Sequence, residues 1–185
     1  MDDRKAIRQL KEGNIGGLEY LIARYQQKGL RAAYLITSNL SLAEDAVQES
    51  FIRIYEKIQF FDSERPFEPY FLRCVVNTAI NGNKKTSRWC TLEDDPELEQ
   101  LSDLFDQTIS VENHIEYMQL REKIQNALAF LSPQQRAVVV QRYYLNMSEQ
   151  EMADTLQVAP GTIKWLLNKA RKRLRSLIES GREQI

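Results

Sequence analysis

The chain has few of the residues that build catalytic and metal centres. Its 185 residues include one histidine, His114, and two cysteines, Cys74 and Cys90. These are too few and too isolated for the ligand spacing of a zinc site or for a disulfide framework. A nucleophile motif and a glycine-rich phosphate loop are also missing. We therefore expect a protein that is not an enzyme and that uses no cofactor or metal ion.

Long apolar runs are missing as well. None approaches the roughly 18 residues of a membrane span. The first residues, MDDRKAIRQLKEG, are charged from the second position and lack the apolar core of a secretory signal. Hydrophobic residues make up 43% of the chain and charged residues 28%, as in a soluble globular protein. We expect a cytoplasmic protein without membrane insertion.

Signals for β-strands are equally scarce, because most apolar residues recur at helical spacing. We expect an all-α protein with helices at residues 3–12, 15–38, 41–58, 66–84, 111–130, 133–145, 148–156 and 160–180. Three helices should begin with a capping box, in which a serine and the residue three places on satisfy free backbone amides. The three pairs are Ser41 with Glu44, Ser132 with Gln135, and Ser148 with Glu151.

The net charge of −1 hides a segregation along the chain. Residues 1–88 carry 14 Lys and Arg against 11 Asp and Glu, residues 89–120 carry none against nine, and residues 121–185 carry 11 against six. The acidic middle contains a proline and has no firm period, so it indicates a flexible linker. We therefore expect two small helical domains, at 1–88 and 113–185, joined by an acidic linker at 89–112. The two basic ends point to nucleic acid as a partner.

The most specific pattern lies between Leu131 and Leu177. Two capped helices, a break at residues 158–161 and a basic helix follow one another, which is the order of a DNA-reading helix-turn-helix. One face of the basic helix is apolar at helical spacing: Ile163, Leu167, Ala170, Leu174 and Leu177. Trp165, Asn168, Lys169 and Lys172 fall on the opposite side. Its clustered cations suit a polyanion, although a solvated basic helix is the alternative for such a run by itself.

Two further patterns lie in the first half. In the helix at 41–58, Ala46, Val47, Ser50 and Ile54 can face the core, while Asp45, Gln48, Glu49 and Arg53 face outward. The outward stripe is either an interface or a solvated surface.

Five aromatic residues surround the loop at 62–66, namely Phe60, Phe61, Phe67, Tyr70 and Phe71. We assign the last three mainly to packing and keep Phe60 and Phe61 as candidates to hold an unstacked base.

Several of these segments resemble conserved domains of bacterial sigma factors. Residues 40–55, LSLAEDAVQESFIRIY, and 69–85, PYFLRCVVNTAINGNKK, are similar to the first conserved domain. The helix-turn-helix at 131–178 is similar to the last. The acidic segment is too short to hold a domain between them. The chain therefore resembles the two-domain group-four sigma factors, the extracytoplasmic-function (ECF) class of the sigma-70 family.

This resemblance implies a transcription-initiation subunit that binds core RNA polymerase and directs it to promoters. It implies docking of Asp45, Gln48 and Glu49, with Arg53 beside them, on the clamp helices of the largest subunit. Contact with the flap of the second-largest subunit and an anti-sigma factor as a further partner are also implied. The linker corresponds to a segment that threads the active-site cleft and RNA exit channel, where a polyanion suits a basic channel; a plain disordered spacer is the alternative.

The resemblance also implies two DNA contacts. Asn77 matches an asparagine on the helix that touches the single-stranded minus-ten element, Phe60 and Phe61 fall in the loop that receives a flipped base, and Asn81 stands where Asp is common. Phosphates would be gripped by Arg73, Lys84, Lys85 and Arg88. The duplex minus-thirty-five element would be read by Thr162, Lys164, Trp165, Asn168, Lys169 and Lys172.

The recognition helix departs from the family pattern at two positions. Trp165 and Leu166 replace a small residue and an arginine. Trp165 either touches a thymine methyl or sugar edge or packs on a neighbouring helix.

Two other functions compete with this reading. A helix-turn-helix regulator that is not a polymerase subunit should bind duplex DNA unaided, usually as a symmetric dimer. A helical adaptor that binds only proteins would leave the basic helix unexplained.

Overall fold

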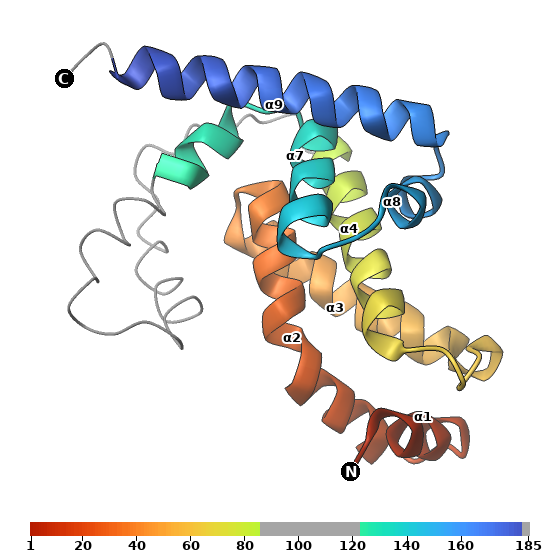
Figure 1. Ribbon diagram of the computed structural model, residues 1–185. Helices are drawn as coiled ribbons and strands as arrows, with labels where there is room; N and C mark the ends of the chain where they lie inside the picture. The colour runs from red at the N-terminus through yellow and green to blue at the C-terminus, as the bar shows by residue number, and fades with distance from the viewer. Residues whose placement is uncertain (86–122, 183–185) are drawn as a thin grey trace.

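The computed structural model describes residues 1–85 and 123–182, which are helical apart from short connections and contain no strand (Figure 1). The first half holds α1 (Asp3–Lys11), α2 (Gly16–Thr37), α3 (Leu40–Lys57), a 3-10 turn η1 (Ile58–Phe60) and α4 (Phe67–Lys85). The second holds a helix at 123–129, α7 (Pro133–Val139), a π-helical turn η3 (Val140–Tyr144), α8 (Glu149–Leu156) and α9 (Pro160–Arg182). The all-α prediction is confirmed. No helix in these two ranges is long and apolar enough to span a membrane.

Aromatic side chains fill the core between α2, α3 and α4. Phe71 is fully buried and stacks on Phe51 with ring centres 4.5 Å apart, and Tyr25 lies 5.5 Å from Phe67. A Cβ atom at Gly29 would lie 2.7 Å from the Phe71 ring, so the glycine lets α2 approach α4 closely. The assignment of residues 67, 70 and 71 mainly to packing is confirmed.

Two of the three predicted capping boxes are present, at Ser132 and Ser148. The prediction for Ser41 is wrong, because α3 begins one residue earlier and is capped by Asn39, whose side chain accepts the Leu42 N–H at 2.8 Å. The reason lies in the end of α2. Ser38 there has a left-handed φ of 53°, which leaves Asn39 extended in the N-cap conformation. Asparagine is at least as good an N-cap as serine.

The helix predicted at 133–145 is regular only to Val139 and continues as the η3 turn to Tyr144. Of the helix predicted at 111–130, residues 123–129 are helical, and the rest lies outside the described residues together with the predicted linker, Cys90 and His114. The remaining predicted helices agree with α1, α2, α4, α8 and α9 to within a few residues.

The two halves pack against each other. The helix-turn-helix has a core of its own, made of Val138, Met152, Ala153, Ile163, Leu166 and Leu167. Ala137 of α7 and Val140 of η3 instead join the core of the first four helices. In Figure 1, α7 lies beside α2 and α4, with α9 crossing its end. The sequence predicted two helical units but not this contact.

Candidate nucleic-acid interface and docking surface

Helix α9 has one buried and one exposed face, as its sequence spacing predicts. Ile163, Leu167 and Ala170 are buried, and the apolar residues at 174 and 177 are half-buried. All six residues predicted to read the minus-thirty-five element are exposed: Thr162, Lys164, Trp165, Asn168, Lys169 and Lys172. The predicted division into two faces is therefore confirmed: one face packs in the core, and the other carries the six residues predicted to contact DNA.

The two departures from the family pattern have different surroundings. Leu166 is 6% exposed and belongs to the helix-turn-helix core, so a side chain at this position packs inside the second half and not on the exposed face. Trp165 is 58% exposed and lies outside that core, and Lys169 Nζ sits 4.8 Å from the centre of its ring. A cation over an indole face is a favourable contact. It holds the two side chains together on the exposed face.

Two cations of α9 already have partners within the second half. Lys164 Nζ lies 3.8 Å from the Glu149 carboxylate, and Arg171 Nε donates to the Tyr143 hydroxyl at 2.9 Å. Lys164 and Arg171 are exposed, so such pairs contribute little stability and yield easily to a competing phosphate. The helix therefore keeps its positive charge available for a polyanion.

The outward stripe of α3 is exposed along its whole length. Asp45, Gln48, Glu49 and Arg53 all face solvent, and Glu49 and Arg53 form an ion pair one turn apart. The residues predicted to face inward, 46, 47, 50 and 54, are buried, and Ser50 Oγ donates to the carbonyl of residue 46 at 2.6 Å. The stripe thus stands on a rigid, well-packed helix.

A shallow groove of about 510 Å³ runs beside this stripe, between α2 and α3. Gln48 and Val47 form one wall, and Ile22, Gln26 and Leu30 of α2 form the other. These α2 residues were not among the predicted site residues. Their spacing of four along the helix, next to the core face, is the signal that identifies them.

The two aromatics predicted to hold a base differ sharply. Phe60 is 89% exposed at the end of η1. Phe61 is 7% exposed and packs in the core with its ring centre 4.7 Å from that of Tyr70. Of these two candidates to hold a base, the fold leaves only Phe60 with a free ring, because the chain turns from the 3-10 turn into an extended residue at 61 and so directs successive side chains to opposite sides.

Next to Phe60 lies a hollow of about 600 Å³. Tyr70 and Arg73 of α4 line it, and so do Met147 and Glu151 from the second half. Hydrogen bonds from Ser148 lower the pKa of the Glu151 carboxyl, and the positive charge of Arg73 contributes to the same shift. A carboxylate of the second domain thus lies near a cation predicted to grip a phosphate.

Asn77 is half-buried on α4 and lines a cleft of about 430 Å³. Arg53 and Asn81 share its side of the cleft, and Thr162 and Trp165 of α9 form the other side. Residues predicted for two separate DNA elements therefore face one another. The predicted phosphate contacts Lys84 and Lys85 belong to the last turn of α4, and Arg88 lies outside the described residues.

Arg136 ties the two halves together. Its guanidinium donates from Nη1 to the Ile36 carbonyl at 3.0 Å and to Ser38 Oγ at 2.5 Å, both at the end of α2. A weaker bond from Nη2 reaches the Leu131 carbonyl at 3.4 Å. Burial lowers the pKa of Arg136 to about 10, so the group stays charged at neutral pH. A buried cation is stable only while such partners surround it. No motif or spacing in the sequence indicates a role for this residue.

Family models match both halves of the chain. Sigma-70 region 2 matches residues 21–88, and sigma-70 region 4 matches residues 121–174. The RNA polymerase sigma-E factor of Streptomyces avermitilis is 31% identical, over 92% of this chain and 90% of that protein. The ECF RNA polymerase sigma factor SigW of Bacillus subtilis is 27% identical, over 93% of this chain and 94% of its own length.

Solved structures have the same fold. CnrH in complex with the cytosolic domain of CnrY is similar with a TM-score of 0.65 and 21% identity, over 96% of this chain and 97% of that one. The structure of the sigma factor RpoE in complex with the anti-sigma factor NepR, from Bartonella quintana, is similar with a TM-score of 0.62 and 21% identity. The similarity covers 87% of this chain and 96% of that one. Together with the sequence matches, the fold shows that the chain belongs to the ECF sigma factors of the sigma-70 family, the RNA polymerase subunits that direct initiation to promoters.

Proposed function

We propose that this sigma factor reads duplex minus-thirty-five DNA with the exposed face of α9 and captures the opened minus-ten strand with Asn77 and Phe60. The observation that carries the proposal is the division of α9 into a packed apolar face and an exposed face with Trp165 and Lys169. The N-terminal part of a recognition helix enters the major groove, and both residues lie in the N-terminal half of α9. Run-off transcription with core polymerase and a random promoter library tests the whole assignment.

The boundaries proposed for the working parts are 1–88 for docking and minus-ten capture, 89–112 for the linker, and 113–185 for minus-thirty-five recognition. The protein acts by binding alone, in the cytoplasm. Its proposed partners are the clamp helices and flap of core polymerase, promoter DNA and an anti-sigma factor. The RpoE structure, which holds an anti-sigma factor and has the same fold, supports the last of these.

Promoter binding requires the two domains to separate. The minus-ten and minus-thirty-five elements lie about 25 base pairs apart, which is roughly 85 Å of duplex at 3.4 Å per base pair. Asn77 and Trp165 line one cleft of about 430 Å³, so they cannot meet elements at that separation in this arrangement. The packed form is therefore the state before promoter binding.

Docking on core polymerase is proposed for the α3 stripe, with the neighbouring groove accepting apolar side chains of the partner. The Asp45→Lys, Glu49→Lys double variant should lose most of its binding to core polymerase, because both carboxylates are exposed and become cations. Co-purification with core polymerase measures this loss. The control is Glu12→Lys, Glu19→Lys, which makes the same charge change at two exposed positions, the C-cap of α1 and the first turn of α2. Equal binding by the two double variants would show that α3 is not the docking surface.

Lys169 and Trp165 should contribute to DNA binding in different ways. Lys169→Ala should reduce the slope of log affinity against log salt by about one unit, since one phosphate contact is lost. Trp165→Ala should leave the slope almost unchanged and relax base preference at one or two minus-thirty-five positions, where a wrong base typically costs about 1–3 kcal/mol. Competition binding over a salt series measures both effects. Thermal unfolding of the second domain by Trp165→Ala, with base preference intact, would identify Trp165 as a packing residue.

A further inference from the structure

Helix α1 contacts the loop that carries Phe60, although α1 lies outside the segment matched by sigma-70 region 2, which begins at residue 21. Lys11 Nζ donates to the Phe61 carbonyl at 2.7 Å. In return, Gln59 Nε2 donates to the Lys11 carbonyl at 2.7 Å. One bond holds the backbone carbonyl that follows Phe60, and the other holds the side chain of the residue that precedes it. An ion pair of 3.4 Å between Arg4 and Glu64 adds a third connection, which is weak because both side chains are mostly exposed.

Close packing holds α1 on α2. Gly17 permits the contact, because a Cβ atom there would lie 2.2 Å from the Ala6 carbonyl oxygen. On the same inward face of α1, Ile7 and Leu10 are buried in the core shared with α2, α3 and α4. The helix therefore has a fixed position before it meets the loop.

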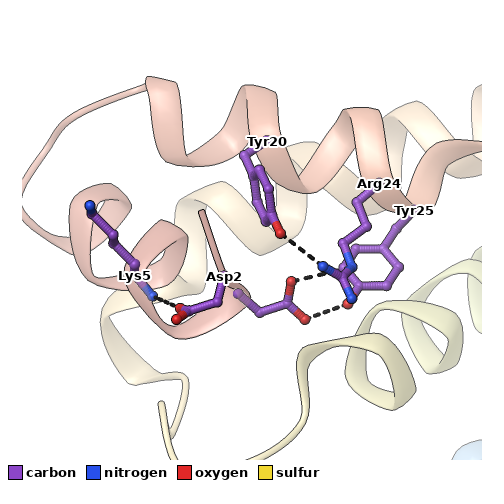
Figure 2. Close-up of polar contacts among 6 residues, drawn as sticks. Asp2, Lys5, Tyr20, Arg24 and Tyr25 are labelled. Atoms are coloured by element: carbon purple, nitrogen blue, oxygen red, sulfur yellow. Dashed lines mark hydrogen bonds and ion pairs between the residues drawn. The ribbon is translucent and has the colours of Figure 1, made fainter.

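A polar network fixes the start of the same helix. The Tyr25 hydroxyl donates to the Asp3 carboxylate, and Arg24 Nε lies 3.6 Å from the other oxygen of that carboxylate. Figure 2 shows this network with Tyr20, which accepts from Arg24 Nη1 at 2.8 Å, and with Asp2, which caps α1. Burial raises the pKa of the Tyr25 hydroxyl, and its hydrogen bond to Asp3 is the second cause of the same shift. The hydroxyl therefore keeps its proton and remains a donor.

We propose that α1 is a brace that positions the Phe60 loop for strand capture, with Lys11 as its positioning residue. Phe60 is 89% exposed, so no packing fixes its ring and its direction depends on the backbone of its neighbours. Ile58 and Phe61 anchor that backbone in the core, and Lys11 holds the carbonyl that follows the exposed ring. A preorganised ring loses less conformational freedom when a base stacks on it. The inference rests on the proposed role of Phe60 in minus-ten capture.

Replacing Lys11 tests the brace. Lys11→Met keeps the length of the side chain and removes the donor, so it should lower open-complex formation about two- to tenfold, the range expected for one hydrogen bond. Lys11→Arg, which keeps a cationic donor, should restore most of the loss. Lys5→Met, at an exposed position of the same helix, is the control and should have no effect. Permanganate reactivity of the minus-ten thymines measures opening, with holoenzyme on a promoter selected from the random library.

A double-mutant cycle with Phe60→Ala separates positioning from general stability. Because Lys11 acts through Phe60, Lys11→Met should have little further effect when Phe60 is already alanine. An equal loss in both backgrounds would overturn the brace. So would an unchanged Lys11→Met variant beside a defective Phe60→Ala variant, a result that leaves the proposed function intact. If Phe60→Ala itself opens promoters normally, the proposed role of Phe60 fails and the brace fails with it.

Discussion

The Ser38→Lys variant should bind duplex DNA about tenfold more tightly than the unaltered protein when core polymerase is absent, because a larger fraction of its molecules is in the separated, binding-competent form. Arg136 donates to Ser38 Oγ at 2.5 Å, so a lysine at that position sets two cations against each other within the domain contact. The packed form then loses stability relative to the separated form. Trp165 faces α4 in the packed form, so only molecules in the separated form bind duplex DNA fully. The apparent affinity for DNA therefore falls as the fraction of packed molecules rises. Ser38 belongs to the first domain, so the DNA-reading domain itself is unchanged.

Fluorescence anisotropy with a pool of short duplexes at fixed salt measures the affinity, and small-angle scattering measures the separation of the domains. Ala137→Asp provides an independent test from the other side of the contact. Ala137 is fully buried in the core of the first four helices and is not part of the helix-turn-helix core. Unchanged affinity together with an increased radius of gyration would show that the domain contact does not hide the reading surface.

The sequence predicts local structure well because local rules decide it. The buried face of α9 follows from a spacing of three to four residues, and the starts of α7 and α8 follow from the capping boxes at Ser132 and Ser148. Ser41 shows the limit of these rules. Its pattern is equally good, but the conformation in which α2 ends makes Asn39 the cap. Competing N-caps two residues apart are decided by the preceding turn, which spacing does not reveal.

Contacts between segments that are distant along the chain could not be predicted from the sequence. Arg136 meets Ile36 across 100 residues, and Lys11 meets Phe61 across 50. No periodicity or motif connects the two members of such a pair. In the sequence, Arg136 and Lys11 each appear as one more cation on a helix. The difference between Phe60 and Phe61 also depends on the exact residue at which η1 ends. The sequence therefore predicts which residue types of the candidate site lie on which helices. It does not predict which of these side chains the fold leaves exposed.

Replacing Phe60 with alanine should lower open-complex formation about tenfold or more, because stacking of one base on an aromatic ring contributes about 1–3 kcal/mol. Its ring is 89% exposed above a hollow that Arg73 and Tyr70 line, so a base flipped from the opened strand has both a stacking surface and a cation for its phosphate. Asn77→Ala should act at the same stage with a smaller loss, since it removes hydrogen bonds and no stacking surface. Neither variant should weaken the first contact with duplex DNA.

Two measurements on the same holoenzyme separate these stages. Permanganate reactivity reports the opened strand, and a mobility shift at low temperature reports the closed complex. The control Phe130→Ala removes an aromatic ring that is 58% exposed in the second domain and should leave both unchanged. An equal loss of closed and open complexes in Phe60→Ala would place its ring on duplex DNA or on the polymerase. Strand capture would then have to depend on Asn77 and Arg73, with the ring of Phe60 contributing only to the approach.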